Sequence, residues 1–416
     1  MSTGVTKSKK IEFPYANAAL LKLGVTEGGF LPSTAEESWK YTNLARLAKI
    51  PFENGNTTNY HSNLDPSSSD KFNNFSHQLF FINGKFISHD NFFPPLPMGI
   101  KVDLLDKKSN NNEYKNNSLL FMNQNLCSDR VKITIGAKIK FNEPISLIFY
   151  NYTKDKPLAI YPNVEIVLEE DSNITIIEQH LSETLSTYWE NSFIDIDLHK
   201  NAELKHYKLN NGCPDTLSTS YSNVLQDLNS KYLCFNLAYG STLYRNETHV
   251  SLNGENSECN LYEAHLLNHK QHADTTSIIS HNVPNCISKK LYRGVLNDNS
   301  RAVAQAKVKV SKLAQLTDAQ QLFRGILLSP NAEINTKPEL EIFADDVKCS
   351  HGAAVGSLDE EQIFYLRSRG LNESASKILL IEAFMNEHFA MIENPRIREL
   401  MLGVFDNWIT IHRKHN

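Results

Sequence analysis

Short runs of alternating apolar and polar residues fill the chain from Lys132 to about Ser350, and very few apolar patterns of helical length interrupt them. Alternation with a period of two predicts β-strands that bury one face. Polar turn residues separate the runs at regular intervals of 28, 28, 27 and 29 residues, marked by Asn173, Asn201, Asn229, Asn256 and Asn285. Asparagine suits such turns because it tolerates left-handed backbone angles and bonds to its own backbone.

A strand-like run follows each of these asparagines, and a second one lies before the next asparagine, as in Phe193–Leu198. A repeat of about 20 to 50 residues is typical of a solenoid, in which each unit buries its apolar face by stacking on the next. We therefore predict a mainly β protein with a β-solenoid core over residues 126–356. The alternative is that each unit is a hairpin in a meander or sandwich, and local sequence does not separate the two.

The N-terminal residues 1–125 have a mixed pattern. Ala16–Leu23 and Ala35–Leu47 are helical candidates, the second with Ser33 or Thr34 available as its cap. A small hairpin is expected where Asn83 and Gly84 join two β-like runs, Gln78–Ile82 and Lys85–Ser88. The polar, Asn-rich segment Lys107–Asn117 predicts a loop, and we place the domain boundary shortly after it.

The C-terminal residues 357–416 predict three helices. They are Asp359–Arg369, Glu373–Ile392 capped by Asn372, and a last helix from Pro395 to about Arg413. The middle helix carries an apolar face wider than packing on one neighbour requires, formed by Ile378, Ile381, Ala383, Phe384, Met385 and Phe389. A partner protein could share this face.

Composition narrows the classes of partner. The 416 residues carry a net charge of −5, which argues against wholesale binding to nucleic acid or to an anionic membrane. The six cysteines show neither a CxxC pair nor zinc-ribbon spacing, and this usage fits a reducing cytosol. With no signal-peptide pattern and no apolar run near the ~18 residues of a membrane span, we expect a cytoplasmic protein whose partners are proteins or small ligands.

The best candidates for chemistry are Cys349 and His351. The segment from Leu340 to His351 has a strand-like pattern, so Val347, Cys349 and His351 should share one face. A thiolate and a neutral imidazole are suitable ligands for zinc or an iron–sulfur cluster, but a closed site needs about four ligands. The missing ligands would come from distant turns or from another subunit. The alternative is a buried cysteine beside a hydrogen-bonded histidine.

Two other groups of polar residues are weaker candidates. Asp345 and Asp346 are adjacent in a strand-like run, so they should face opposite sides and not serve one site. His265, His269 and His272 lie inside the β repeat, where a polar turn is the simpler interpretation of their spacing. No phosphate-binding loop and no nucleophile-elbow motif is present, so we expect this chain not to bind or hydrolyse ATP.

The run KPELEIFADDVKCSHGAAVGSLDEEQIFYLRSRG, residues 337–370, resembles the C-terminal signature of the SufB/SufD family of the SUF iron–sulfur cluster assembly system. A second run, FLPSTAEESWKYTNLARL at residues 30–47, is similar to an N-terminal segment of the SufD branch. SufB proteins are longer and carry more cysteines, whereas this signature holds Cys349 alone, so the resemblance is nearer to SufD. One departure is DAQQLFRGILL at residues 318–328, which puts the strand register near Arg324 in doubt.

The resemblance implies a right-handed β-helix flanked by helical segments, acting as a non-enzymatic scaffold. It implies pairing with SufB through the β-helix, or with a second copy when the chain is isolated. His351, with Cys349, would serve cluster assembly at that interface and hold metal only transiently. The ATPase SufC would dock on the C-terminal helices, where the candidate contacts are Glu361, Phe364, Tyr365, Arg367, Ile381 and Phe384.

No tightly bound cofactor is implied for the isolated chain, and the resemblance does not specify flavin. Two other functions fit a β-solenoid. One is a carbohydrate-active enzyme that uses an acidic, aromatic-lined face, although such enzymes are normally exported. The other is a stand-alone metalloprotein that combines Cys349 and His351 with another histidine.

Overall fold

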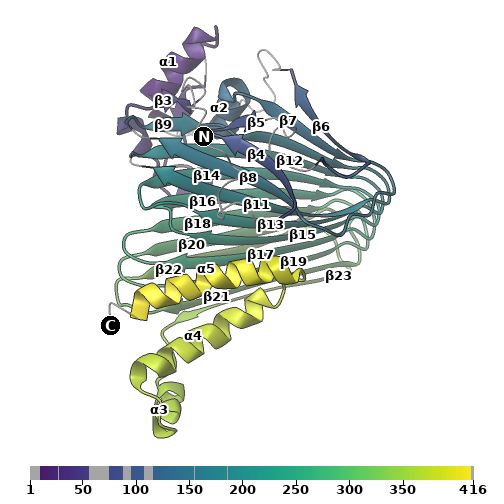
Figure 1. Ribbon diagram of the computed structural model, residues 1–416. Helices are drawn as coiled ribbons and strands as arrows, with labels where there is room; N and C mark the ends of the chain where they lie inside the picture. The colour runs from purple at the N-terminus through teal and green to yellow at the C-terminus, as the bar shows by residue number, and fades with distance from the viewer. Residues whose placement is uncertain are drawn as a thin grey trace, which may run out of the picture.

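Two long, mainly parallel β-sheets stack face to face and form a β-solenoid of about eight turns between residues 131 and 356 (Figure 1). The computed structural model describes residues 10–26, 28–55, 75–87, 95–106, 116–153, 155–184 and 186–413. The chain alternates between the sheets, so strands two apart in sequence are neighbours in space. The predicted mainly β solenoid is confirmed, and the hairpin meander is excluded because the core strands pair in parallel.

The strands of the 11-stranded sheet, in spatial order, are β22 (Glu333–Ile342), β20 (Arg301–Val310), β18 (His272–His281), β16 (Leu243–Leu252), β14 (Thr216–Gln226), β12 (Tyr188–Leu198), β10 (Asn163–Leu168), β7 (Arg130–Ile135) and β6 (Ile100–Leu105). Two short strands, β3 (Glu53–Asn54) and β9 (Leu158–Ile160), pair beside β12. Strand β6 runs antiparallel to β7, so the N-terminal part of the chain already belongs to this sheet.

The strands of the 10-stranded sheet, in the same direction, are β23 (Val347–Gly356), β21 (Thr317–Leu327), β19 (Ile287–Leu296), β17 (Glu258–Leu267), β15 (Lys231–Tyr239), β13 (Glu203–Asn211), β11 (Asn173–Thr184), β8 (Ile145–Thr153), β4 (His77–Ile82) and β5 (Lys85–Ile87). The predicted hairpin is confirmed as the antiparallel pair of β4 and β5, joined by Asn83 and Gly84 at positive φ. Ser88, predicted as its last residue, lies outside the described residues, as does most of the predicted loop Lys107–Asn117.

One corner of the solenoid repeats the same left-handed backbone conformation in successive turns. Positive φ angles recur there at Lys138, Asp171, Asn201, Asn229, Asn256, Asn285 and Leu316. The side-chain amides also stack: Asn201 donates to Asp171 at 2.8 Å, Asn229 donates to Asn201 at 2.9 Å, and Asn256 donates to Asn229 at 3.1 Å. The predicted asparagine turns are thus confirmed at four positions. Asn173 is the exception, because it opens β11 and Asp171 takes the left-handed position.

The interior of the solenoid is divided into an apolar half and a polar half. Near the asparagine corner, the inward positions are filled by aliphatic side chains such as Ile176, Ile196 and Leu204, all fully buried. Farther along the same strands, the inward positions carry fully buried charged residues, including Glu178 and Lys208. The apolar half supplies the hydrophobic free energy, and the polar half requires mutually satisfied partners.

Helices cover parts of the outer faces of both sheets. At the C-terminus, α3 (Glu360–Ser368) extends away from the solenoid, whereas α4 (Glu373–Phe389) and α5 (Pro395–Arg413) lie across the 10-stranded sheet (Figure 1). The predicted caps are confirmed, because the side chains of Asp359 and Asn372 accept backbone N–H bonds at the starts of α3 and α4. The N-terminal helices α1 (Pro14–Lys22) and α2 (Ser118–Leu126) pack together at the other end, with the two-residue strands β1 (Ile11–Glu12) and β2 (Phe30–Leu31). None of the described helices is long and apolar enough to cross a membrane.

The predicted helix Ala35–Leu47 is wrong. This segment forms only two 3₁₀ turns, Glu37–Trp39 and Leu47–Lys49. The reason is that the chain follows the outer face of the 11-stranded sheet, where the Trp39 ring lies 3.8 Å from the guanidinium of Arg245. Close by, the hydroxyl of Thr42 donates to Asp274. These tertiary contacts outweigh the weak helical preference of the segment.

Replacing Asn229 tests the corner. Alanine pays the steric cost of the left-handed region and glycine does not, so Asn229→Ala should destabilise the fold by about 1–2 kcal/mol relative to Asn229→Gly. Both variants lose the side-chain ladder bonds, so the comparison isolates the effect of the left-handed backbone conformation on the free energy of unfolding. The measurement is the urea midpoint of each variant. Equal midpoints would show that the left-handed backbone is not what selects asparagine here.

Candidate functional site

Cys349 and His351 lie on β23, which is the last strand of the 10-stranded sheet. They are in register with Ala319 and Gln321 of β21, both of which are buried on the inward side of that strand. The predicted shared face of Val347, Cys349 and His351 is confirmed by this register. Cys349 is half-buried against the apolar interior, whereas His351 is exposed because no further turn of the described chain covers it. We call Cys349, His351 and the buried Gln321 beneath them the open-end site.

The segment from Leu340 to His351 is not one strand, as its pattern suggested. It forms the end of β22 in one sheet and the start of β23 in the other, with a corner at residues 343–346. Asp345 and Asp346 lie in this corner, both exposed, and neither faces the open-end site as part of a carboxylate pair. The corner forms because each turn of the solenoid must cross from one sheet to the other.

Burial raises the pKa of the Cys349 thiol above its ordinary value, and the nearby carboxylate of Asp318 acts in the same direction. A backbone hydrogen bond with Ala319 opposes the shift without cancelling it. The thiol is therefore protonated at neutral pH. It would lose its proton on binding a metal, as thiolate ligands do.

The described residues contain no group of three or more histidine, cysteine or acidic side chains arranged to hold a metal ion. The structure also separates the three histidines of the HLLNHKQH run: His265 is buried inside the solenoid, His269 lies in an outer turn, and His272 opens β18. Their interpretation as a turn is confirmed for His269, which has φ +52°. The open-end site thus offers two soft ligands, and any closed metal site there needs others.

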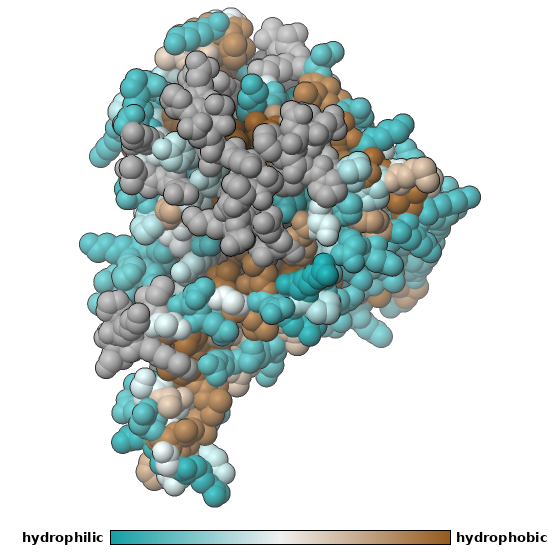
Figure 2. Space-filling model, viewed as in Figure 1, coloured by the Kyte–Doolittle hydropathy of each residue, from teal (hydrophilic) through white to brown (hydrophobic). Residues whose placement is uncertain are grey.

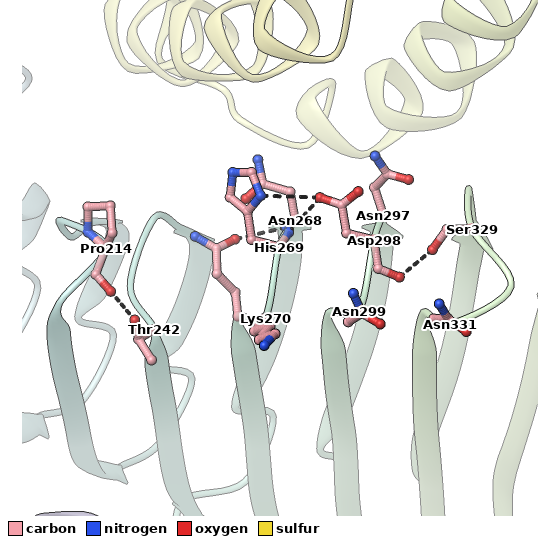
Figure 3. Close-up of a pocket in the computed structure, with 11 residues that line it drawn as sticks. Pro214, Thr242, Asn268, His269, Lys270, Asn297, Asp298, Asn299, Ser329 and Asn331 are labelled. Atoms are coloured by element: carbon pink, nitrogen blue, oxygen red, sulfur yellow. Dashed lines mark hydrogen bonds and ion pairs between the residues drawn. The ribbon is translucent and has the colours of Figure 1, made fainter. Parts of the chain in front are cut away.

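A polar groove of about 820 Å³ runs along the edge of the solenoid opposite the asparagine corner (Figure 3). Turn residues line it, among them His269, Lys270 and Asp298. The ring of His269 is paired with Asp298, Nδ1 to Oδ2 at 3.3 Å, and the backbone N–H of His269 donates to the same carboxylate at 2.8 Å. The groove is wide and open, and these paired groups stabilise its turns.

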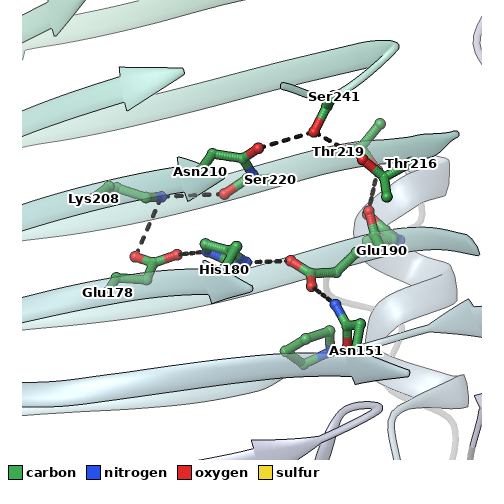
Figure 4. A network of polar contacts seen from close by, with 12 residues as sticks. Asn151, Glu178, His180, Glu190, Lys208, Asn210, Thr216, Thr219, Ser220 and Ser241 are labelled. Carbon is green, nitrogen blue, oxygen red and sulfur yellow. Dashed lines mark hydrogen bonds and ion pairs between the residues drawn. The ribbon is translucent and has the colours of Figure 1, made fainter. Parts of the chain in front are cut away.

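A buried network of charged groups crosses the polar half of the interior (Figure 4). The imidazole of His180 lies between two carboxylates, with Nε2 2.5 Å from Glu178 and Nδ1 2.5 Å from Glu190. The ammonium of Lys208 lies 3.5 Å from Glu178 and also donates to Ser220 at 3.2 Å. A second pair, Lys290 and Glu263, lies three turns farther toward the open end, with the two groups 3.1 Å apart.

Glu178 and His180 stay charged within this network because each lies beside opposite charge. Burial alone would raise the pKa of Glu178, but Lys208 and the two neighbouring histidines outweigh it and hold the pKa well below its usual range. Burial would likewise lower the pKa of His180, but Glu190 and Glu178 raise it to about 9. We did not predict this network from the sequence. The sequence feature that could have indicated it is that Glu178 and His180 continue the alternation of inward-facing residues begun by Ile174 and Ile176.

Other buried histidines lack an adequate partner charge. Burial lowers the pKa of His265 to about 4, that of His281 to about 4 and that of His388 to about 3. These three imidazoles are neutral in the folded protein. His281, on the inner face of β18, shares a hydrogen bond of 2.8 Å with the hydroxyl of Ser288.

The C-terminal candidate contacts divide into exposed and buried residues. On α3, the side chains of Phe364 and Tyr365 are 73% and 57% exposed. Glu361 and Arg367 on the same helix are also exposed. By contrast, Ile381 of α4 is buried against the solenoid and α5. Figure 2 shows hydrophobic surface over the C-terminal helices.

Phe384 is partly covered by the guanidinium of Arg293, 4.7 Å from its ring centroid. The wide apolar face predicted for the middle helix therefore packs largely within this chain, and the apolar groups left free are mainly on α3.

The protein is thus of the parallel β-solenoid class, with a soft-ligand pair on its last strand. The comparisons name the family: residues 150–384 match the SufBD core domain of the SUF system for FeS cluster assembly. The chain therefore belongs to the SufBD family, a component of SUF iron–sulfur cluster assembly. Membership in this family argues against the alternative that the chain is a carbohydrate-active enzyme. The register near Arg324 is regular, with Arg293 and Ala354 as its neighbours, so the departure in that segment does not disturb the strand.

Two relatives show the extent of the similarity. An iron–sulfur cluster assembly SufBD family protein of Synechocystis sp. is 30% identical over 383 residues, which cover 86% of this chain and 83% of the relative. The iron–sulfur cluster assembly protein SufD of Escherichia coli is 28% identical over 383 residues, covering 90% of this chain and 88% of that protein. Both alignments include the solenoid and much of its flanks.

The buried neutral histidines predict loss of stability in acid. Below about pH 6.5, the unfolded chain binds protons that the folded chain does not bind until about pH 4, so the free energy of unfolding falls as the pH falls through this window. His281→Gln should reduce that loss by at most about 3 kcal/mol, since glutamine keeps a partner for Ser288 without titrating.

The measurement is the urea midpoint of wild type and variant across this pH window. His269→Gln is the matched control, because it removes an imidazole from an exposed turn. An acid slope in His281→Gln as steep as that of the wild type would contradict the assignment of His281.

Proposed function

We propose that this chain is a SufD-like, non-enzymatic scaffold subunit that presents Cys349 and His351 to a SufB-type subunit during iron–sulfur cluster assembly. The observation that carries the proposal is the open end of the solenoid. Among the described residues, β22 and β23 have no strand on their outer sides, and the thiol and imidazole stand on the last of these strands. The similarity to SufD of Escherichia coli supports a role in cluster assembly, and the choice of a SufD-like subunit rests on Cys349 being the only cysteine in the segment 337–370.

The open end is suited to pairing with another protein. Unpaired edge strands present backbone N–H and C=O groups that a strand of a partner can satisfy. Here the two edges, β22 and β23, are each ten residues long and lie next to each other. A partner that continues both sheets would cover His351 and bring its own ligands to Cys349 and His351. A transient cluster could then be held by ligands from both subunits, which two residues alone do not provide.

We further propose that α3 is the contact for a SufC-type ATPase. Phe364 and Tyr365 expose most of their aromatic rings, although the guanidinium of Arg369 lies 5.2 Å from the Tyr365 ring centroid. Aromatic residues are enriched at the centres of protein interfaces. Glu361 and Arg367 would contribute polar contacts around them. Ile381 and Phe384 would support α4 from within rather than contact the ATPase. In the proposed role the protein is cytoplasmic, holds no resident cofactor and can form a homodimer when isolated.

The first test replaces His351. In the complex purified after co-expression, His351→Ala should abolish cluster formation, because an imidazole ligand is lost, while the subunits stay associated. The measurements are iron and sulfide content and the composition of the complex by size-exclusion chromatography. Ser350→Ala is the matched control, since Ser350 is the adjacent residue on the opposite face of β23. Normal cluster content in His351→Ala would refute the role of the open-end site.

The second test concerns α3. The double variant Phe364→Ser/Tyr365→Ser should weaken capture of the ATPase subunit by about tenfold or more, since two anchoring rings are lost. The fold should persist, because both rings are exposed. Leu313→Ser changes a residue that is 75% exposed and lies in the turn between β20 and β21. It controls for a general loss of surface hydrophobicity. Undiminished capture by the α3 variant would place the ATPase contact elsewhere.

A further inference from the structure

Three residues form a column on the inner face of the 10-stranded sheet and end at the open-end site. Lys290 on β19, Gln321 on β21 and His351 on β23 are direct register partners. Neighbouring strands lie about 4.8 Å apart, and register partners point to the same side of a sheet. Gln321 therefore lies between the buried Lys290 and the candidate ligand His351 in this column.

Lys290 already has a strong partner. Its ammonium lies 3.1 Å from the carboxylate of Glu263, and both side chains are at most 3% exposed. A buried ion pair of this kind keeps its geometry because separating the charges would be costly. The register partner of Gln321 on the buried side of the column is thus held in place by an ion pair.

The amide of Gln321 has a determined orientation. Its Nε2 donates to the backbone carbonyl of Glu339, on β22 across the interior, at 3.1 Å. A carbonyl oxygen only accepts, so the nitrogen must be the atom on that side and Oε1 must face away. Gln321 is 2% exposed, and its Oε1 has no hydrogen-bond partner among the described residues. A buried acceptor without a partner costs about 1–3 kcal/mol, and a partner that binds later is one way in which that cost is offset.

We infer that Gln321 is a positioning residue for His351: its Oε1 accepts the ring N–H of His351 when the open-end site is occupied. This inference rests on the proposed function of His351. An imidazole that ligates a metal through one nitrogen donates the other N–H to an oxygen acceptor, which fixes the tautomer and the ring orientation. His351 is in register with that free acceptor, and the amide cannot turn away without losing its bond to Glu339.

The inference predicts a specific pattern of variants in the co-purified complex reconstituted anaerobically with iron and sulfide. Gln321→Leu should lower cluster content about tenfold, in line with the loss of an outer partner of a metal ligand. It should also change the histidine nitrogen hyperfine coupling of the reduced cluster in pulsed EPR. Gln321→Glu should restore both readouts, because its carboxyl still offers an oxygen acceptor to the ring N–H of His351. Gln320→Leu, an exposed neighbour on the outward face, is the matched control and should behave as wild type.

The outcomes separate this inference from the proposed function. Normal cluster content in Gln321→Leu, alongside its loss in His351→Ala, would overturn the inference and leave the proposed function standing. A fall in content with unchanged hyperfine coupling, or without rescue by Gln321→Glu, would also overturn it, because Gln321 would then act only in packing. Normal content in His351→Ala would remove the proposed function and the inference with it. A fall with altered coupling and rescue supports the positioning role.

Discussion

In-register parallel pairing between successive turns is the constraint on which this molecule depends. It places equivalent residues of each strand directly above one another, so every inward position belongs to a column with its own chemistry. An aliphatic column is stabilised by packing alone. A column with charged groups, such as that of Glu178 and Lys208, persists only where each charge meets its opposite. The division of the interior into an apolar and a polar half follows from this requirement.

The same constraint connects the interior to the site. Because β23 repeats the register of β21 and β19, His351 inherits a position whose earlier occupants are the buried Gln321 and Lys290. The imidazole is thus the exposed last member of a polar column. The helices, by contrast, are attached to the outer face, where Ile381 and Phe389 pack on the sheet and leave α3 free. Interior and exterior surfaces of one sheet thereby serve two separate proposed contacts.

Much of this arrangement could be predicted from local sequence. Alternation of apolar and polar residues predicted the strands, and asparagines such as Asn229 predicted the corner. Asp359 and Asn372 predicted the starts of two helices. Each of these features acts within a few residues of the chain. The helix expected at Ala35–Leu47 failed because Trp39 meets Arg245, more than 200 positions away. The residues in register with His351 could not be predicted from the sequence either. The intervals between left-handed corner residues range from 27 residues, between Asn229 and Asn256, to 33, between Lys138 and Asp171, so register cannot be counted along the chain.

The two ends of the solenoid are chemically unlike. At one end β22 and β23 offer long edges that continue the parallel ladders, whereas the other finishes in β5 and β6, whose antiparallel direction breaks them. A copy of the molecule stacked head to tail on its neighbour would therefore not continue the parallel ladders, and such continuation is the route by which repetitive β proteins grow into fibres. The direction of two strands, β5 and β6, thus makes the end at β22 and β23 the one that can extend both parallel ladders.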